Sequence, residues 1–195
     1  MNDTNLVNDN LRKEADEFLY GKGLYSGLEK FGHVKITGSY SLKLMTWHDL
    51  DIYLVEENMS LSNFFKIGSF VANLLSPTKM HFRNERLNKS AGLPHGLYWG
   101  IYLGDERNGA WKIDIWVISH SQCAALDEFS NKYKDIPEKS RSIILDIKSK
   151  CWMKSGYRRS YTSVDIYDAV LSHGIEDIAG FETYLKCTKR CSLDA

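Results

Sequence analysis

The chain has 195 residues, of which 43% are hydrophobic and 26% charged, and its formal net charge is zero. This is the composition of a soluble globular protein, and no apolar run approaches the roughly 20 residues that span a bilayer. Nucleic-acid-binding proteins usually carry a basic footprint, so the neutral charge argues against a long nucleic acid as substrate. The first residues lack the basic and apolar regions of a signal peptide, and we therefore expect a cytoplasmic protein.

The first part of the chain predicts helices at its start and then strands interrupted by one long helix. Apolar residues at helical spacing predict a helix over residues 10–29. A second helix is expected over residues 60–76, where a serine caps the first turn and Pro77 follows the last. Short apolar or alternating runs predict five strands. Their ranges are 31–37, 49–55, 79–86, 97–103 and 111–118.

After residue 119 the pattern changes, because no further run indicates a strand. Helical spacing and capping residues predict four helices there, at 121–133, 137–151, 160–173 and 175–187. The whole pattern predicts an α/β (α+β) fold, in which helices back a small mixed and largely antiparallel sheet and more helices follow. We divide the chain into a core domain, residues 1–119, and a C-terminal helical segment, residues 120–195.

Two carboxylates lie at the start of the strand expected over residues 49–55. Because successive strand side chains point to opposite faces, Asp49 and Asp51 share one face and Leu50 faces the other way. Two close carboxylates repel each other unless a cation lies between them. Magnesium prefers such oxygen ligands and usually keeps waters and substrate phosphates in its shell. The pair therefore predicts a divalent metal site.

A third carboxylate, Asp114, lies in the middle of the apolar run at residues 111–118. An unpaired charge is costly to bury, so an acid in such a run needs a physical reason. If this strand lies beside the strand at 49–55, Asp114 faces the same metal site. Two metals held about 3.5–4 Å apart can clamp the attacking and leaving oxygens of a phosphoryl displacement.

The dipeptide Gly38-Ser39 follows the first expected strand. Gly38 permits a tight turn, and Ser39 follows where a hydroxyl and backbone N–H groups could meet a phosphate. On its own the pair also suits an ordinary strand-ending turn. The Asp-Leu-Asp motif that follows it favours the functional interpretation.

Together, Gly38-Ser39, Asp49-Leu50-Asp51 and Asp114 resemble the motif of the nucleotidyltransferase superfamily, which has the polymerase beta fold. The resemblance covers residues 31–119 and is greatest in size and layout for small antibiotic and minimal nucleotidyltransferases. It implies transfer of a nucleoside monophosphate from ATP or another nucleoside triphosphate, with two Mg²⁺ ions and release of pyrophosphate. By the same resemblance, Asp49 and Asp51 bind both ions, and Asp114 binds the catalytic ion and takes the acceptor proton.

A basic cluster near the expected helix at 137–151 bears on the same chemistry. A triphosphate carries charges that two magnesium ions neutralise only in part, and a lysine or arginine commonly completes the neutralisation. We select Lys148 and Lys154 as the candidate phosphate ligands. The alternative is a solvated helix end whose cations suit the helix dipole. The cluster comprises Lys148, Lys150, Lys154, Arg158 and Arg159.

The acceptor is open at this stage. The size and neutral charge favour a small hydroxylated molecule, such as an aminoglycoside or lincosamide antibiotic. The alternatives are a protein modified by AMP, as in toxin–antitoxin pairs, a nucleic-acid 3′ end, and a non-catalytic nucleotide-binding module. The sequence does not give the oligomeric state, and the resemblance allows a homodimer, because a second subunit sometimes completes the acceptor site in related small enzymes.

Overall fold

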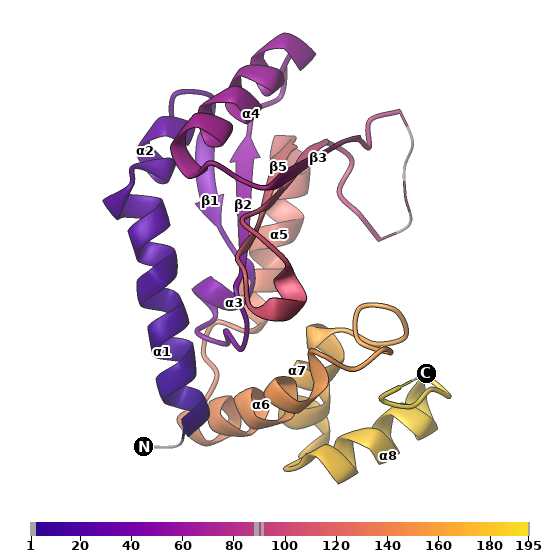
Figure 1. The fold of residues 1–195 in the computed structure, drawn as a ribbon. Coiled ribbons are helices and arrows are strands. Elements are labelled where there is room, and N and C mark those ends of the chain that lie inside the picture. The colour runs from indigo at the N-terminus through magenta and orange to yellow at the C-terminus, as the bar shows by residue number, and fades with distance from the viewer. Residues whose placement is uncertain (1–2, 88–89, 91, 195) are drawn as a thin grey trace. The chain divides into compact units, whose positions relative to one another are not determined.

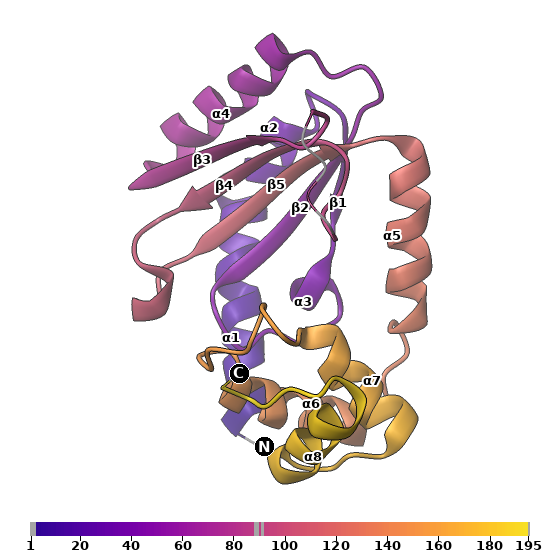
Figure 2. The same cartoon turned by 90° about the vertical axis from the view of Figure 1, so that its right-hand side faces the viewer.

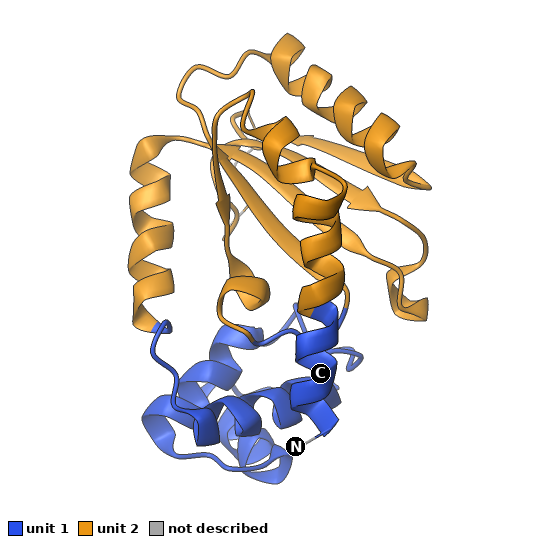
Figure 3. Cartoon of the chain, turned by 90° about the vertical axis from the view of Figure 1, so that its left-hand side faces the viewer, with its two compact units in different colours: residues 1–11, 44–47, 133–195 blue, residues 12–43, 48–132 orange. Residues whose placement is uncertain are grey.

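The computed structural model describes residues 3–87, 90 and 92–194, and Figure 1 shows the helices and strands along the chain. The chain forms two compact units, which Figure 3 distinguishes by colour. The sheet unit comprises residues 12–43 and 48–132, and the helical unit comprises residues 1–11, 44–47 and 133–195. These units are not split at residue 119, so the two-domain division given above stays a prediction.

A five-stranded sheet forms the centre of the sheet unit, in the order β1-β2-β5-β4-β3. Strands β2 and β5 are parallel, and the other three neighbouring pairs are antiparallel. The predicted fold class, a small mixed and largely antiparallel sheet with helices, is therefore confirmed. The strands are β1 (His33–Ile36), β2 (Asp49–Val55), β3 (Lys79–Asn84), β4 (Leu97–Tyr102) and β5 (Lys112–Ile118).

The helices before and between the strands differ from the prediction mainly at the start of the chain. The first helix begins at Asp3 rather than at residue 10, and Gly23, with φ of 81°, separates it from the next helix. The long helix agrees with the prediction for residues 60–76. Ser60 caps it as expected, because its side chain accepts a hydrogen bond from the backbone of Asn63. These elements are α1 (Asp3–Asp16), the π-helical turn η1 (Glu17–Gly21), α2 (Leu24–Leu28), α3 (Gly38–Ser41), α4 (Leu61–Leu75), the 3₁₀ turn η2 (Glu106–Asn108) and α5 (His120–Lys132).

The two faces of the sheet have different roles. One face is apolar and packs on α4, where the rings of Phe64 and Trp99 stack with centroids 5.7 Å apart. Gly68 of α4 permits this contact, because a Cβ there would lie 2.8 Å from the Trp99 ring. The other face carries Asp49 and Asp51, and helix α5 packs on part of it. Figure 2 shows α4 and α5 on opposite sides of the strands.

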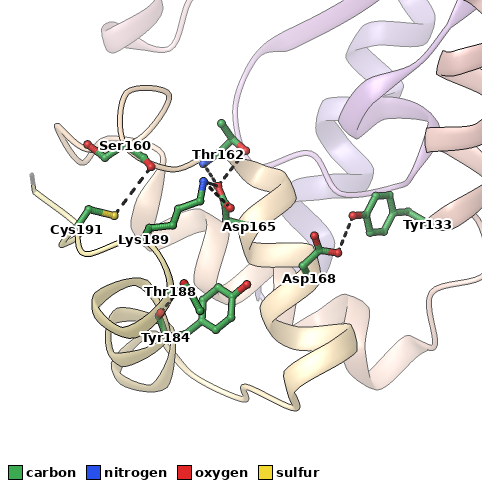
Figure 4. Close-up of polar contacts among 9 residues, drawn as sticks. All are labelled: Tyr133, Ser160, Thr162, Asp165, Asp168, Tyr184, Thr188, Lys189 and Cys191. Carbon is green, nitrogen blue, oxygen red and sulfur yellow. Dashed lines mark hydrogen bonds and ion pairs between the residues drawn. The ribbon is translucent and has the colours of Figure 1, made fainter. Parts of the chain in front are cut away.

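The helical unit contains α6 (Glu138–Cys151), α7 (Ser163–His173) and α8 (Ile178–Thr188). Figure 4 shows the polar contacts that hold it. The carboxylate of Asp165 accepts a hydrogen bond from the backbone N–H of Thr162 at 2.7 Å. This bond provides a partner for the N–H group of the residue that caps α7. The same carboxylate pairs with Lys189 at 2.8 Å, and Tyr133 donates to Asp168 at 2.8 Å. No helix in the described part of the chain is long and apolar enough to cross a membrane.

The segment Leu44–Trp47, which connects α3 to β2, belongs to the helical unit. The backbone N–H of Met45 donates to the side chain of Asn8 at 2.9 Å. The ring of Trp47 stacks on that of Trp152, with centroids 5.8 Å apart and an interplanar angle of 10°. The chain therefore leaves the sheet unit for four residues immediately before the first acidic strand.

Candidate active site

The register of β2 and β5 brings the predicted acids onto one face. In this parallel pair, Asp51 lies opposite Asp114 and Asp49 lies opposite Lys112. Residues opposite each other point to the same face of a sheet, and so do residues two positions apart in one strand. All four side chains therefore share a face. The expectation that the strand carrying Asp114 lies beside the strand carrying the Asp-x-Asp motif is confirmed.

Lys112 is part of this cluster, although it is not among the site residues predicted from the sequence. Its Nζ lies 3.7 Å from Oδ1 of Asp49 and forms a closer ion pair with Asp114. The side chains of Lys112, Asp49 and Asp114 are only 10%, 14% and 15% exposed. Partial burial strengthens this attraction, because less water screens the charges. The signal was available, since Lys112 is two residues from Asp114 in the same strand.

Gly38 allows the carboxylate of Asp51 to approach the turn after β1. Its φ is 64°, in the left-handed region. A Cβ at this position would lie 2.1 Å from Oδ2 of Asp51, which is far inside van der Waals contact. Ser39 is buried in the single turn of α3 that follows. The turn and the acid are therefore fitted to each other, and any side chain at Gly38 would separate them.

Tyr98 of β4 holds the third acid. Its hydroxyl donates a hydrogen bond to Oδ1 of Asp114 at 2.7 Å. The residue opposite Asp114 in β4 is Gly100, and a Cβ there would lie 2.4 Å from the Tyr98 hydroxyl. Burial raises the pKa of Tyr98, and the charge of Asp114 raises it further, so the phenol stays protonated as a donor. This residue was missed because the sequence does not give the register of β4.

Tyr53 continues the same face of β2, two residues beyond Asp51. Burial raises the pKa of its phenol, and the negative charges of Asp51 and Asp114 raise it further. Opposite Tyr53 in β5 is Trp116, whose ring lies 4.7 Å from that of Tyr98. The acids are therefore bordered on one side by a row of aromatic side chains.

The donor chemistry of the three carboxylates fits magnesium, which prefers hard oxygen ligands. Their present arrangement is not a finished metal cage: within residues 3–87, 90 and 92–194, no three acidic, histidine or cysteine side chains are placed to hold an ion. The ammonium group of Lys112 pairs with both Asp49 and Asp114 in this arrangement. The assignment of Asp49, Asp51 and Asp114 as metal ligands stays a prediction.

The two lysines expected to bind phosphate lie in the helical unit. Lys148 is 1% exposed, and its Nζ donates to the backbone oxygen of Leu44 at 2.7 Å. Lys154 pairs with Asp194 at 3.0 Å. These contacts stabilise the helical unit itself. The phosphate role of both lysines stays a prediction.

The chain is similar to known proteins in its structure and not in its sequence. No protein-family model matches the chain, and no curated protein matches it. Nine chains of solved structures match. The Cid1 poly(U) polymerase, with magnesium and 3′-dATP bound, has a TM-score of 0.50 at 11% identity, over 88% of this chain and 55% of that chain.

Two further structures are similar at slightly lower scores. The non-canonical poly(A) polymerase complex GLD-2–GLD-3 has a TM-score of 0.49 at 13% identity, over 100% of this chain and 62% of that chain. A cytoplasmic RNA terminal U-transferase has a TM-score of 0.47 at 14% identity, over 88% of this chain and 54% of that chain.

The first of these likenesses identifies the fold. The likeness to the Cid1 poly(U) polymerase shows that the chain has the polymerase beta-type nucleotidyltransferase fold that its Gly-Ser and Asp-x-Asp motifs predict. The chain spans between 54% and 62% of the length of the three polymerase chains. A likeness at 11% identity shows the fold alone, because one fold can host many unrelated functions.

Proposed function

We propose that this protein is a magnesium-dependent nucleotidyltransferase, which moves a nucleoside monophosphate from a nucleoside triphosphate to a hydroxyl group of a small molecule. One observation carries the proposal: Asp51 and Asp114 lie opposite each other on neighbouring strands, and Asp49 shares their face. Three carboxylates on one sheet face repel one another, and the single positive charge of Lys112 offsets only one of these three negative charges. The polymerase beta-type fold of the chain supports the proposal.

The reaction assigns a task to each acid. Magnesium held by Asp49, Asp51 and Asp114 would neutralise the triphosphate and stabilise the charge that develops at its α-phosphate. Asp114 accepts the proton of the acceptor hydroxyl, and Tyr98 orients the carboxylate for this task. The hydroxyl oxygen then bonds to the α-phosphorus, the bond to the bridging oxygen breaks, and pyrophosphate leaves. Positioning and electrostatics supply most of the rate.

The outer phosphates need further partners. Gly38 and Ser39 are the proposed contacts, because the turn that they form lies against Asp51. Lys148 and Lys154 remain the proposed cationic contacts from the helical unit. Each would have to exchange its present partner, Leu44 or Asp194, for a phosphate oxygen.

A nucleic-acid 3′ end is the second candidate acceptor, and the edge strand β3 favours it. Lys79, His81 and Arg83 lie on the same face as the acids, since their partners in β4 are Tyr102, Gly100 and Tyr98. Lys79 and Arg83 are the positively charged members of this row and could attract phosphates, although Arg83 also pairs with Glu85. Binding of a short RNA that falls steeply with salt would favour this acceptor over a small molecule.

The proposal is tested by calorimetric titration with each nucleoside triphosphate and Mg²⁺. We expect magnesium-dependent binding in the wild type and none in the Asp49→Asn/Asp51→Asn double variant. The single variant Asp51→Asn should lose transfer of labelled monophosphate by about 10³-fold or more, because the metal loses a charged ligand. Glu128→Gln, which removes an exposed acid of α5, is the matched control. Transfer at the wild-type rate by a folded Asp51→Asn protein would refute the assignment.

A further inference from the structure

A pocket of about 400 Å³ opens on the sheet face that carries the acids. Its wall comes from three places in the sheet unit: the ends of two strands, the loop before β4, and helix α5. This volume is in the range of small-molecule sites, about 300–1,000 Å³. The main lining residues are Tyr53, Leu93, Pro94, Ile118, Leu126 and Phe129.

The pocket begins one row of side chains beyond the acids. Tyr53 lines it and follows Asp51 by two residues on the same face of β2, a spacing of about 6.7 Å along a strand. Leu93 and Leu126, also in its wall, pack against a buried cluster that includes Tyr98. Tyr98 in turn holds Asp114. The wall of the pocket and the proposed catalytic acid are therefore connected through Tyr98.

The lining selects for an apolar occupant. None of the described residues that line the pocket is charged, and the polar side chains among them are the phenol of Tyr53 and the amide of Gln122. A polycation or a nucleic-acid phosphate would lose hydration there without gaining a counter-charge, which is costly. Phe129 is 37% exposed at the mouth, so an apolar group that covered it would be favoured.

We infer that this pocket is the acceptor site, and that the acceptor is an amphipathic alcohol with its apolar part in the pocket and its hydroxyl group directed toward Asp114. The inference rests on the proposed nucleotidyl transfer and narrows its substrate class. It favours an acceptor of lincosamide-like character over a polycationic aminoglycoside. The products are a phosphodiester on the acceptor oxygen and pyrophosphate, with the acceptor proton passing to Asp114.

Two neighbouring alanines of α5 provide a matched pair of variants. Ala125 lines the pocket and Ala124 does not, and both are exposed, so a tryptophan at either position leaves the core intact. The probes are 2-phenylethanol and lincomycin as amphipathic alcohols, and kanamycin as a polycationic alcohol. Saturation-transfer NMR measures their binding to the full chain in the presence of Mg²⁺ and the nucleoside triphosphate that binds.

We expect both amphipathic alcohols to bind the wild type and Ala124→Trp, and to bind Ala125→Trp at least tenfold more weakly. Kanamycin should not bind. With Mn²⁺ in place of Mg²⁺, the CH₂OH protons of bound 2-phenylethanol should relax faster than its ring protons, because the hydroxyl end lies nearer the acids. Nucleotide binding should be equal in all three proteins.

The outcomes separate this inference from the proposed function. Absence of magnesium-dependent nucleotide binding in the wild type refutes both. If nucleotide binding is normal, the acceptor pocket alone is refuted by any one of three results. Neither amphipathic alcohol binds, or Ala125→Trp binds them as tightly as the wild type does, or Mn²⁺ leaves the relaxation of the bound protons unchanged. Binding of kanamycin would overturn the proposed acceptor class. Transfer of the nucleotide to the 3′ end of a short RNA, with no transfer to an amphipathic alcohol, would overturn it as well.

Discussion

Replacing Lys112 by methionine removes the positive charge from the acid cluster and keeps a side chain of similar length. At the observed 3.7 Å from Asp49, the attraction is about 4.5 kcal/mol before desolvation, with an effective dielectric constant of about 20. Removing one member of a largely buried ion pair costs about 3–5 kcal/mol. We take about 3 kcal/mol, since these side chains keep some contact with water.

In a metal-free buffer, this loss should lower the melting temperature of Lys112→Met by about 6–12 °C, given about 2–4 °C per kcal/mol for a chain of this size. Magnesium should reverse much of the loss, because binding to the folded state alone stabilises it. The increase in melting temperature with Mg²⁺ should be larger in Lys112→Met than in the wild type, where the ion must first displace the ammonium group. Thermal melts with EDTA and with about 10 mM Mg²⁺ measure both quantities.

The control is Lys79→Met, which removes an exposed lysine from the same sheet face, in line with Lys112 across Tyr102. It should melt within about 1–2 °C of the wild type in both buffers, because surface substitutions usually change stability by less than 0.5 kcal/mol. The reasoning fails if Mg²⁺ stabilises Lys112→Met no more than the wild type. It also fails if Lys112→Arg, which retains the charge, loses as much stability as the methionine variant.

Two more predictions concern the sheet unit. Tyr98→Phe should keep the fold and lower the transfer rate by about tenfold, since Asp114 loses one orienting hydrogen bond. Gly100→Ala should mimic it, because its Cβ would displace the phenol; equal rates in all three proteins would exclude this positioning role. The hydrogen bond from Lys35 holds the pKa of Asp127 below its ordinary value. This stabilisation is present above the unfolded pKa of about 3.9 and is lost as pH falls through the folded pKa. The melting difference between wild type and Asp127→Asn should therefore be seen at pH 7 and should shrink as the pH falls below about 3.9 toward the folded pKa.

The sequence was most informative where a pattern depends on one strand alone. The alternation in Asp49–Val55 fixed which face its acids share, and the strand has the predicted bounds. The same kind of pattern predicted the strand that contains Asp114. Apolar spacing and the serine cap placed α4 within one residue at each end. In each case, neighbouring residues contain all of the information needed.

Features that depend on distant parts of the chain were not predictable in this way. The hydrogen bond from Tyr98 to Asp114 requires the register of β4 on β5, which no local pattern encodes. Lys148 resembles a solvent-facing helix residue in sequence, yet its amine donates to Leu44, 104 residues earlier. The first helix starts at Asp3 and not at residue 10, and its residues up to Leu11 belong to the helical unit.

The excursion of residues 44–47 into the helical unit has a consequence for how the protein can be divided. Neither unit is continuous in sequence, and the four-residue strap runs between Gly38-Ser39 and Asp49. Leu44 and Met45 are fully buried, so a fragment that ends before residue 133 would leave them uncovered. During synthesis, residues 44–47 cannot be buried until the last third of the chain has been made. A chimera that exchanges the C-terminal helices with those of another protein would need to carry the strap with them.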